Sequence, residues 1–259
     1  NNETNNSGNN YVSWNWLANG VGSSNTDGSI NTTYTSASTT SGFSMSTYTG
    51  TGSAATVGHG LGVAPKIVIV KRYSTSGGGW LMQNSNLTSA SYVLKLNGED
   101  AESNDGANFN SAAPTDNHFS VYNSNNTNAS GANHIAYCFA EKTGFSKFGS
   151  YTGNGNADGP FNYTGFRPAF IMIKLTSSTE SWRIYDSKRI GYNVDNKYLN
   201  ANNTAAETIG STLYMDILSN GFKLRGTDNS INSNNASYIF MAFAEAPIVG
   251  SNNVPANAR

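Results

Sequence analysis

The chain has 259 residues, a formal net charge of −1 and only 12% charged residues. A balance this close to neutral argues against a nucleic-acid-binding surface, which needs clustered Lys and Arg. No apolar run approaches the length of a membrane span, so membrane insertion is not expected either. The hydrophobic share of 37% can build folded cores. The many Asn, Ser, Thr and Gly residues favour turns and short polar loops, while Val, Ile, Tyr, Phe and Thr favour strands, so strands joined by polar turns are expected.

The first residues look like the end of a repeat unit. The strand-like run Tyr11–Trp16 follows an Asn-rich stretch, as does a similar run at His134–Phe139. We therefore expect residues 1 to about 20 to be the closing strand of an upstream repeat, in a polypeptide that is naturally longer at this end. The alternative is that this strand is borrowed to complete a module further along the chain. Residues 20–41 are rich in Ser, Thr, Asn and Gly, so residues 1–41 are interpreted as this strand plus a connector.

Residues 42–142 contain six predicted strands. They are expected at Phe43–Tyr48, Lys66–Arg72, Trp80–Gln83, Tyr92–Leu96, Phe119–Tyr122 and His134–Glu141. The run Ile67–Val70 lacks polar alternation, which is typical of a central strand covered on both faces. Gly-rich and Asn-rich turn signals separate the strands. The spacing predicts an antiparallel β-sandwich of jelly-roll-like type.

The second half of the chain repeats the first at an offset of about 103 residues. Gly42-Phe43-Ser44 recurs as Gly144-Phe145-Ser146, Pro65–Lys71 as Pro168–Lys174, Trp80 as Trp182, and His134–Glu141 as Tyr238–Glu245. Ordered matches at a nearly constant offset indicate a duplication. Residues 143–250 are therefore predicted to form a second β-sandwich, followed by a polar tail at 251–259. The short linker between the two modules predicts that they pack rigidly end to end.

The single cysteine and two of the three histidines are interpreted as structural. Cys138 lies in an apolar run, where a buried thiol is expected rather than a nucleophile. His59, between glycines, is expected in a turn before a strand. His134 aligns with Tyr238 and is expected to pack at the start of a strand. The sequence offers no such interpretation for His118.

Carboxylates are the candidate catalytic groups, because glycoside hydrolysis needs only two of them, suitably spaced. Glu99, Asp100 and Glu102 cluster in one polar loop, while Glu141 and Glu245 occupy equivalent positions in the two halves. A residue that recurs in both copies is expected to be structural, because one active site does not need duplicating. We therefore predict no catalytic residues.

Metal, cofactor and ligand sites are equally hard to find. Asp27-Gly28, Asp105-Gly106 and Asp158-Gly159 lack the spacing of a calcium loop and are expected to be turns. No metal and no cofactor is predicted. Trp80 and Trp182 could stack on sugar rings, but their equivalence in the two halves favours core positions for both. The identity of any ligand-binding residue stays open.

Three blocks carry a family resemblance that spans essentially the whole chain. They are Thr56–Lys66, Gly144–Gly155 and Tyr238–Pro247. These blocks resemble repeat modules of marine bacteriophages, in proteins described as tail-fibre-like or virion structural. The resemblance implies a virion surface location and brings no catalytic residues with it.

Three functions follow as hypotheses. The first is a phage virion structural or adhesion protein that presents loops to the host surface, contacts other virion proteins and forms a homo-oligomer, with a trimer expected. The second is a lectin-like carbohydrate-binding module, which is compatible with the first. The third is a polysaccharide depolymerase, which the sequence disfavours.

Overall fold

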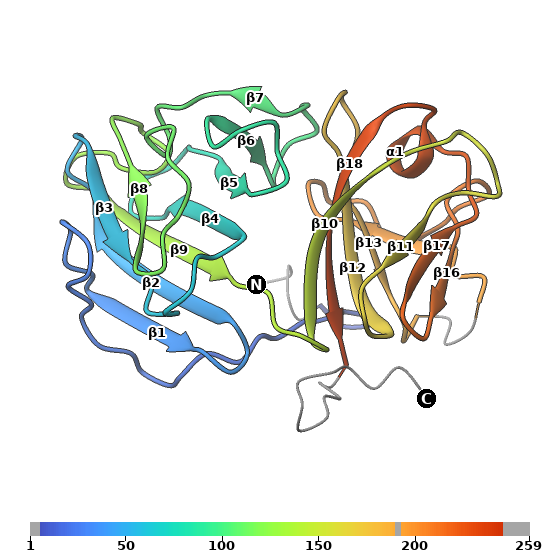
Figure 1. Cartoon of the computed structure of the whole chain (residues 1–259), viewed down its shortest axis with the longest axis horizontal. Coiled ribbons are helices and arrows are strands. Elements are labelled where there is room, and N and C mark those ends of the chain that lie inside the picture. Colours follow the sequence, from blue (N-terminus) through green and yellow to red (C-terminus); the bar gives the residue numbers. More distant parts are fainter. Residues whose placement is uncertain (1–5, 190–192, 246–259) are drawn as a thin grey trace.

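The structure, a computed structural model, describes residues 6–189 and 193–245 and is almost entirely β-strand. Figure 1 shows the two halves of the chain side by side, with one short helix, α1 (Asn229–Asn232), in the second half. All pairings between named strands are antiparallel, as in β1 with β2 and β12 with β18. The all-β fold predicted from composition is confirmed. The described part of the chain contains no helix with the length and apolar character of a membrane span.

Seven strands of the first half form one large sheet in the order β1-β2-β9-β4-β5-β6-β7. Their bounds are β1 (Tyr34–Ser38), β2 (Phe43–Thr49), β4 (Ile67–Arg72), β5 (Trp80–Asn84), β6 (Tyr92–Lys95), β7 (Ser103–Asn104) and β9 (Asn133–Phe139). A small sheet pairs β3 (Ala55–Gly58) with β8 (His118–Val121). β4 lies between β9 and β5 and is buried from Ile67 to Val70, so the predicted central strand is confirmed.

The second half contains a large sheet of six strands in the order β10-β18-β12-β13-β14-β15. Their bounds are β10 (Ser146–Thr152), β12 (Pro168–Leu175), β13 (Arg183–Asp186), β14 (Lys197–Asn200), β15 (Thr208–Ile209) and β18 (Ser237–Ala244). A small sheet contains β11 (Phe161–Tyr163), β17 (Gly221–Leu224) and β16 (Met215–Leu218) in that order. Apart from the additional β1, the two large sheets have the same strand order. The strands β2, β9, β4, β5, β6 and β7 correspond in turn to β10, β18, β12, β13, β14 and β15.

Three hydrophobic cores connect these four sheets. In each half, one core lies between the large and the small sheet, as between Val68 and Phe119 or between Ile173 and Phe222. The third core joins the inner faces of the two large sheets. The halves therefore pack face to face, and the predicted end-to-end packing is wrong. The reason is that β4 and β12 are apolar on both faces, so each large sheet needs a second cover besides its small sheet.

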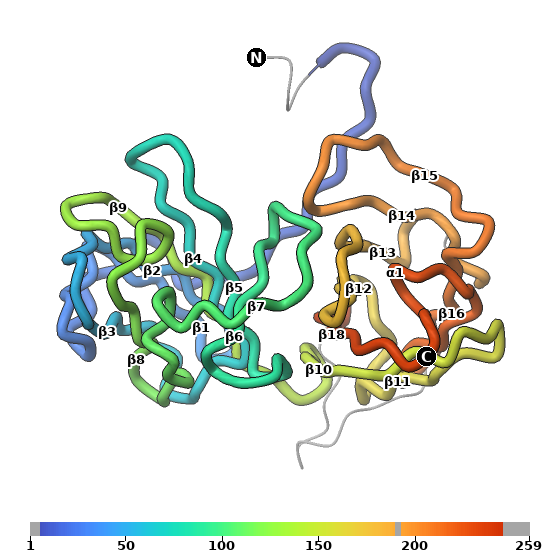
Figure 2. Tube along the Cα trace, turned by 90° about the horizontal axis from the view of Figure 1, so that it is seen from above, coloured from blue at the N-terminus to red at the C-terminus, as the bar shows by residue number. Residues whose placement is uncertain are grey.

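The N-terminal segment departs from the expectation. Residues 6–22 form no strand, so neither a closing strand nor a borrowed one is present there. Instead, the segment crosses the junction between the halves (Figure 2), where the Trp16 ring meets Phe170 at 5.7 Å and Phe243 at 5.4 Å. The expected connector also contains a strand, β1, which pairs with β2. The predicted tail at 251–259 lies outside the described residues.

Candidate functional site

One end of the first large sheet is left open on its inner face. The strand register brings Thr47, Ile135, Lys71 and Trp80 into a single row across β2, β9, β4 and β5. Alternation along each strand places this row on the same face as the core that joins the two halves. All four residues are only partly buried, and the described residues that line the space around them all belong to the first half. We call this row and its surroundings the Trp80 groove.

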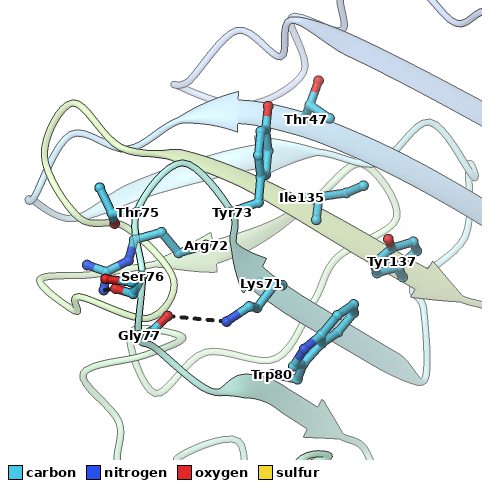
Figure 3. A pocket seen from close by; sticks show the side chains of 10 residues that line it. All are labelled: Thr47, Lys71, Arg72, Tyr73, Thr75, Ser76, Gly77, Trp80, Ile135 and Tyr137. Carbon is cyan, nitrogen blue, oxygen red and sulfur yellow. Dashed lines mark hydrogen bonds between the residues drawn. The ribbon is translucent and has the colours of Figure 1, made fainter. Parts of the chain in front are cut away.

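The Trp80 groove is bounded by the hairpin between β4 and β5 (Figure 3) and has a volume of about 530 Å³. The Trp80 ring stacks on Tyr137, with centroids 6.0 Å apart and an interplanar angle of 17°. Tyr73 adds a third aromatic ring and is 55% exposed. The groove thus presents a pre-formed aromatic surface next to solvent.

Two cationic side chains line the groove and hold the turn of its hairpin through hydrogen bonds. The Lys71 ammonium donates hydrogen bonds to the carbonyl oxygens of Gly77, at 3.2 Å, and Gly78, at 2.8 Å. The Arg72 guanidinium donates to the carbonyl oxygen of Ser76 at 3.2 Å. None of the ten residues drawn in Figure 3 is acidic, so the charge of the groove lining is positive.

The groove offers the groups that recognise saccharides. Aromatic faces pack against the apolar C–H face of a sugar ring, and hydroxyl groups and cations supply hydrogen bonds to its oxygens. The hydroxyls here belong to Thr47, Tyr73, Thr75, Ser76 and Tyr137. A partly apolar cleft of several hundred cubic ångströms with a few convergent polar groups is the usual form of a small-molecule site.

The matching row of the second half is closed. Lys174 and Trp182 are 0% and 1% exposed. A loop of the first half covers them: Trp182 Nε1 donates to the Lys95 carbonyl oxygen at 3.0 Å, and Glu180 N donates to that of Glu99 at 3.0 Å. Burial lowers the pKa of Lys174 to about 8. The prediction of two core tryptophans is therefore confirmed for Trp182, whereas Trp80 is only partly buried and packs against the edge of the shared core.

A shared backbone contact links the two tryptophans, and the sequence pattern did not reveal it. Trp80 N donates to Asn97 Oδ1 at 2.8 Å, and Trp182 N donates to Asn202 Oδ1 at 2.9 Å. Each Asn lies in the loop that follows the next strand, β6 or β14. The available signal was an Asn two positions after each of those strands, which is weak in a chain so rich in Asn.

The cysteine and two of the histidines are structural. Cys138 is fully buried, and burial raises the pKa of its thiol to about 12, as the predicted inert role requires. His134 is also fully buried and stacks on Tyr48 at 5.2 Å, which confirms a packing role at the strand start. His59 is buried in the turn after β3, where Nδ1 accepts from Leu61 N at 3.2 Å. His118 lies on β8 and is partly buried.

The candidate carboxylates have separate partners. Glu99 accepts from Ser181 Oγ at 2.6 Å and Glu102 accepts from Thr88 N at 2.9 Å, while Asp100 faces Lys95 at 3.7 Å. These contacts fasten one loop to its surroundings. Glu141 accepts from the backbone N of Phe148 at 2.9 Å, and Glu245 pairs with Lys188 at 2.8 Å.

The Asp-Gly pairs also have local partners. Asp27 N donates to Asn25 Oδ1 at 2.9 Å, Asp105 accepts from Asn108 N at 3.1 Å, and Asp158 pairs with Lys223 at 2.7 Å. Across residues 6–189 and 193–245, no group of three or more His, Cys, Asp or Glu side chains is arranged to hold a metal ion.

A comparison of the sequence with known proteins gives one result. The family model described as "Domain of unknown function (DUF7483)" matches residues 1–247. This match includes both large sheets and the Trp80 groove. No curated protein and no solved structure matches the chain.

Proposed function

The chain belongs to the DUF7483 family, and we propose that it is a non-catalytic attachment protein of a bacteriophage particle that binds a host-surface saccharide in the Trp80 groove. The saccharide-binding part of the proposal rests on the open groove with its aromatic and hydroxyl-bearing lining. The resemblance of Thr56–Lys66 and Gly144–Gly155 to tail-fibre-like modules of marine phages supports the proposal that the protein is part of a phage particle. In this proposal the protein lies on the virion surface.

The proposal includes a tandem architecture of two jelly-roll-like β-sandwich modules derived from one duplicated unit. The matching strand orders of the two large sheets support it. So do paired contacts at matching positions, since Tyr48 stacks on His134 at 5.2 Å and Tyr151 stacks on Tyr238 at 4.8 Å. A stack of four β layers with three cores forms a stiff body, which suits an appendage that holds a groove toward a surface.

Contacts with other virion proteins and a homotrimer are part of the same proposal. Leu17 and Val21 in the N-terminal segment are 74% and 90% exposed and provide apolar surface for such contacts. Proteomics of purified particles and the mass of the protein in solution test these points. A chain missing from the particle but active in saccharide binding would support the lectin-like alternative.

The saccharide proposal is tested on an array of bacterial surface polysaccharides with three proteins. These are the wild type, Trp80→Ala, and Tyr163→Ala as a control for loss of an exposed ring on β11, far from the groove lining. We expect Trp80→Ala to weaken binding at least about fivefold, because a ring stacked on an aromatic side chain contributes roughly 1–3 kcal/mol where nucleic-acid bases are bound in this way. Tyr163→Ala should bind as the wild type does. Equal binding by all three proteins, or by none of them, would overturn the proposal.

A further inference from the structure

A second pocket of about 300 Å³, partly open to solvent, adjoins the Trp80 groove and is lined by residues of both large sheets and of the N-terminal segment. Its walls come from both halves, with Tyr137 and Phe139 on one side and Met172 and Met241 on the other. All of its lining side chains are aliphatic, aromatic or methionine. We call this space the inner chamber.

The inner chamber and the Trp80 groove are neighbours. Trp80 and Tyr137 line both of them, so this stacked pair of rings is shared by the groove, whose lining includes hydroxyl groups and cations, and by the apolar chamber. Trp14 and Trp16 of the N-terminal segment also line the chamber. Trp14 is held by an edge contact to Phe170 at 5.4 Å, with Arg189 at 5.8 Å from its ring.

The chamber exists because the two halves meet unevenly. On the side of the second half, Trp182 belongs to the shared core and the loop after β6 covers it. On the side of the first half, Trp80 stands at the opening. The residue after β6 is Leu96, whereas the residue after β14 is the small Ala201, and both line the chamber. The side chain of Ala201 is smaller than that of Leu96 and takes up less of this space.

Such a space favours an apolar occupant. Water in it finds few hydrogen-bond partners because the lining is apolar, and smaller apolar cavities of about 150 Å³ engineered in other proteins take up benzene. The inner chamber is about 300 Å³ in volume. It therefore has room for an alkyl chain of several carbons or for an aromatic ring.

We propose that the ligand is amphiphilic, an acylated or arylated saccharide whose sugar occupies the Trp80 groove and whose apolar substituent enters the inner chamber. The sugar half of this inference rests on the function proposed above, and the apolar half rests on the chamber alone. The ligand class is that of glycolipids and glycosides with an apolar aglycone. A saccharide without such a substituent uses only the outer half of the site.

Calorimetric titration with methyl β-D-glucopyranoside and hexyl β-D-glucopyranoside tests the inference, with the hexyl compound kept below its micelle concentration. We expect the hexyl glycoside to bind at least tenfold more tightly, because each buried methylene adds to the affinity. Ala201→Phe fills the chamber and should reduce the difference to less than twofold. Ala205→Phe, in the same loop but away from the chamber lining, is the matched control and should keep the full difference.

The outcomes separate this inference from the proposed function. If the hexyl compound binds no better than the methyl compound while array saccharides still bind through Trp80, the inner chamber has no role and the function stands. A hexyl preference that survives Ala201→Phe would also overturn the inference, because it would arise elsewhere on the surface. If Ala201→Phe removes the preference for the hexyl compound but Trp80→Ala leaves saccharide binding unchanged, the chamber is a binding site and the groove is not.

Discussion

At the scale of single residues, the most informative comparison is between the two tryptophans at matching chain positions. Trp182 is buried beneath a loop of the first half, while Trp80 is partly exposed and stacks on Tyr137. Both have the same backbone contact to an Asn. The difference between a fully buried tryptophan and a partly exposed one therefore comes from what covers the side chain, which is a tertiary property.

Truncation should separate these two roles. Trp182→Ala removes a fully buried indole and should lower the free energy of unfolding by about 3–5 kcal/mol. Trp80→Ala should cost less than half as much, because part of the ring already faces solvent. Denaturant titrations followed by circular dichroism measure both values. Equal losses would show that Trp80 is a core residue and would argue against the groove.

His134 makes stability depend on pH. Burial lowers its pKa from the ordinary 6.5 to about 4. The unfolded chain takes up this proton near pH 6.5 and the folded chain only near pH 4, so the free energy of unfolding should fall by about 2–3 kcal/mol as pH drops from 7 to 4. His134→Gln should remove most of this fall. A remainder is expected from His59, whose pKa burial also lowers.

Denaturant titrations of wild type and His134→Gln between pH 4 and pH 7 test this prediction. Carboxylates titrate in the same range, but they are common to both proteins and cancel in the comparison. An identical pH dependence in the two proteins would contradict the account of His134 as a buried neutral ring.

At the scale of elements, the sequence predicted the long strands well. The six strands expected in the first half are present as β2, β4, β5, β6, β8 and β9, with ends shifted by no more than two residues. The strands that were missed are β1, β3 and β7. β7 has only two residues, β3 lies in a Gly-rich stretch, and β1 lies in a segment whose composition favours loops. Their formation depends on the neighbouring strand more than on local preference.

A Tyr-Thr-Gly motif, present as Tyr48-Thr49-Gly50 and again as Tyr151-Thr152-Gly153, has a physical cause at this scale. A Cβ atom on Gly50 would lie 2.3 Å from the Ala129 carbonyl oxygen, and one on Gly153 would lie 2.2 Å from that of Ser233. Gly50 directly follows the end of β2 and Gly153 directly follows the end of β10, and at each glycine another loop passes close to the backbone. The close approach of two backbones explains why both halves have glycine there.

Substitution of this glycine should therefore be costly. Gly153→Ala should lower the free energy of unfolding by about 1–3 kcal/mol, since the neighbouring backbone must move. Gly98→Ala is the control, because its nearest neighbour would be Lys95 Cβ at an ordinary 3.4 Å. Thermal melts of both variants give the comparison. A Gly153→Ala protein as stable as Gly98→Ala would contradict the close packing.

At the scale of the whole molecule, the shared core decides both stability and the position of the groove. Phe243 lies at its centre and contacts the rings of Phe139 at 5.9 Å and Phe148 at 5.6 Å. The recurrence of similar sequence blocks in the two halves could be seen in the sequence, but the face-to-face packing could not. Without it, there was no way to tell which row of the large sheet would be covered and which would stay open.

Because the core is shared, the two halves should unfold together. Calorimetry should show one transition for the chain, and Phe243→Ala should lower the free energy of unfolding by about 3–5 kcal/mol while keeping a single transition. Phe161→Ala, which removes a ring that is 45% exposed on β11, should have little effect. Two separate transitions in the wild type would contradict the shared core.

The central claim is that a saccharide binds in the Trp80 groove. Its most direct test is a ¹H–¹⁵N NMR titration of the protein with the strongest array saccharide, following the indole N–H signals of the four tryptophans. We expect the Trp80 indole and the backbone amides of Lys71 and Tyr73 to shift with ligand concentration, while the buried Trp182 indole stays in place. Shifts confined to residues outside the groove, with the Trp80 signal unmoved, would contradict the claim.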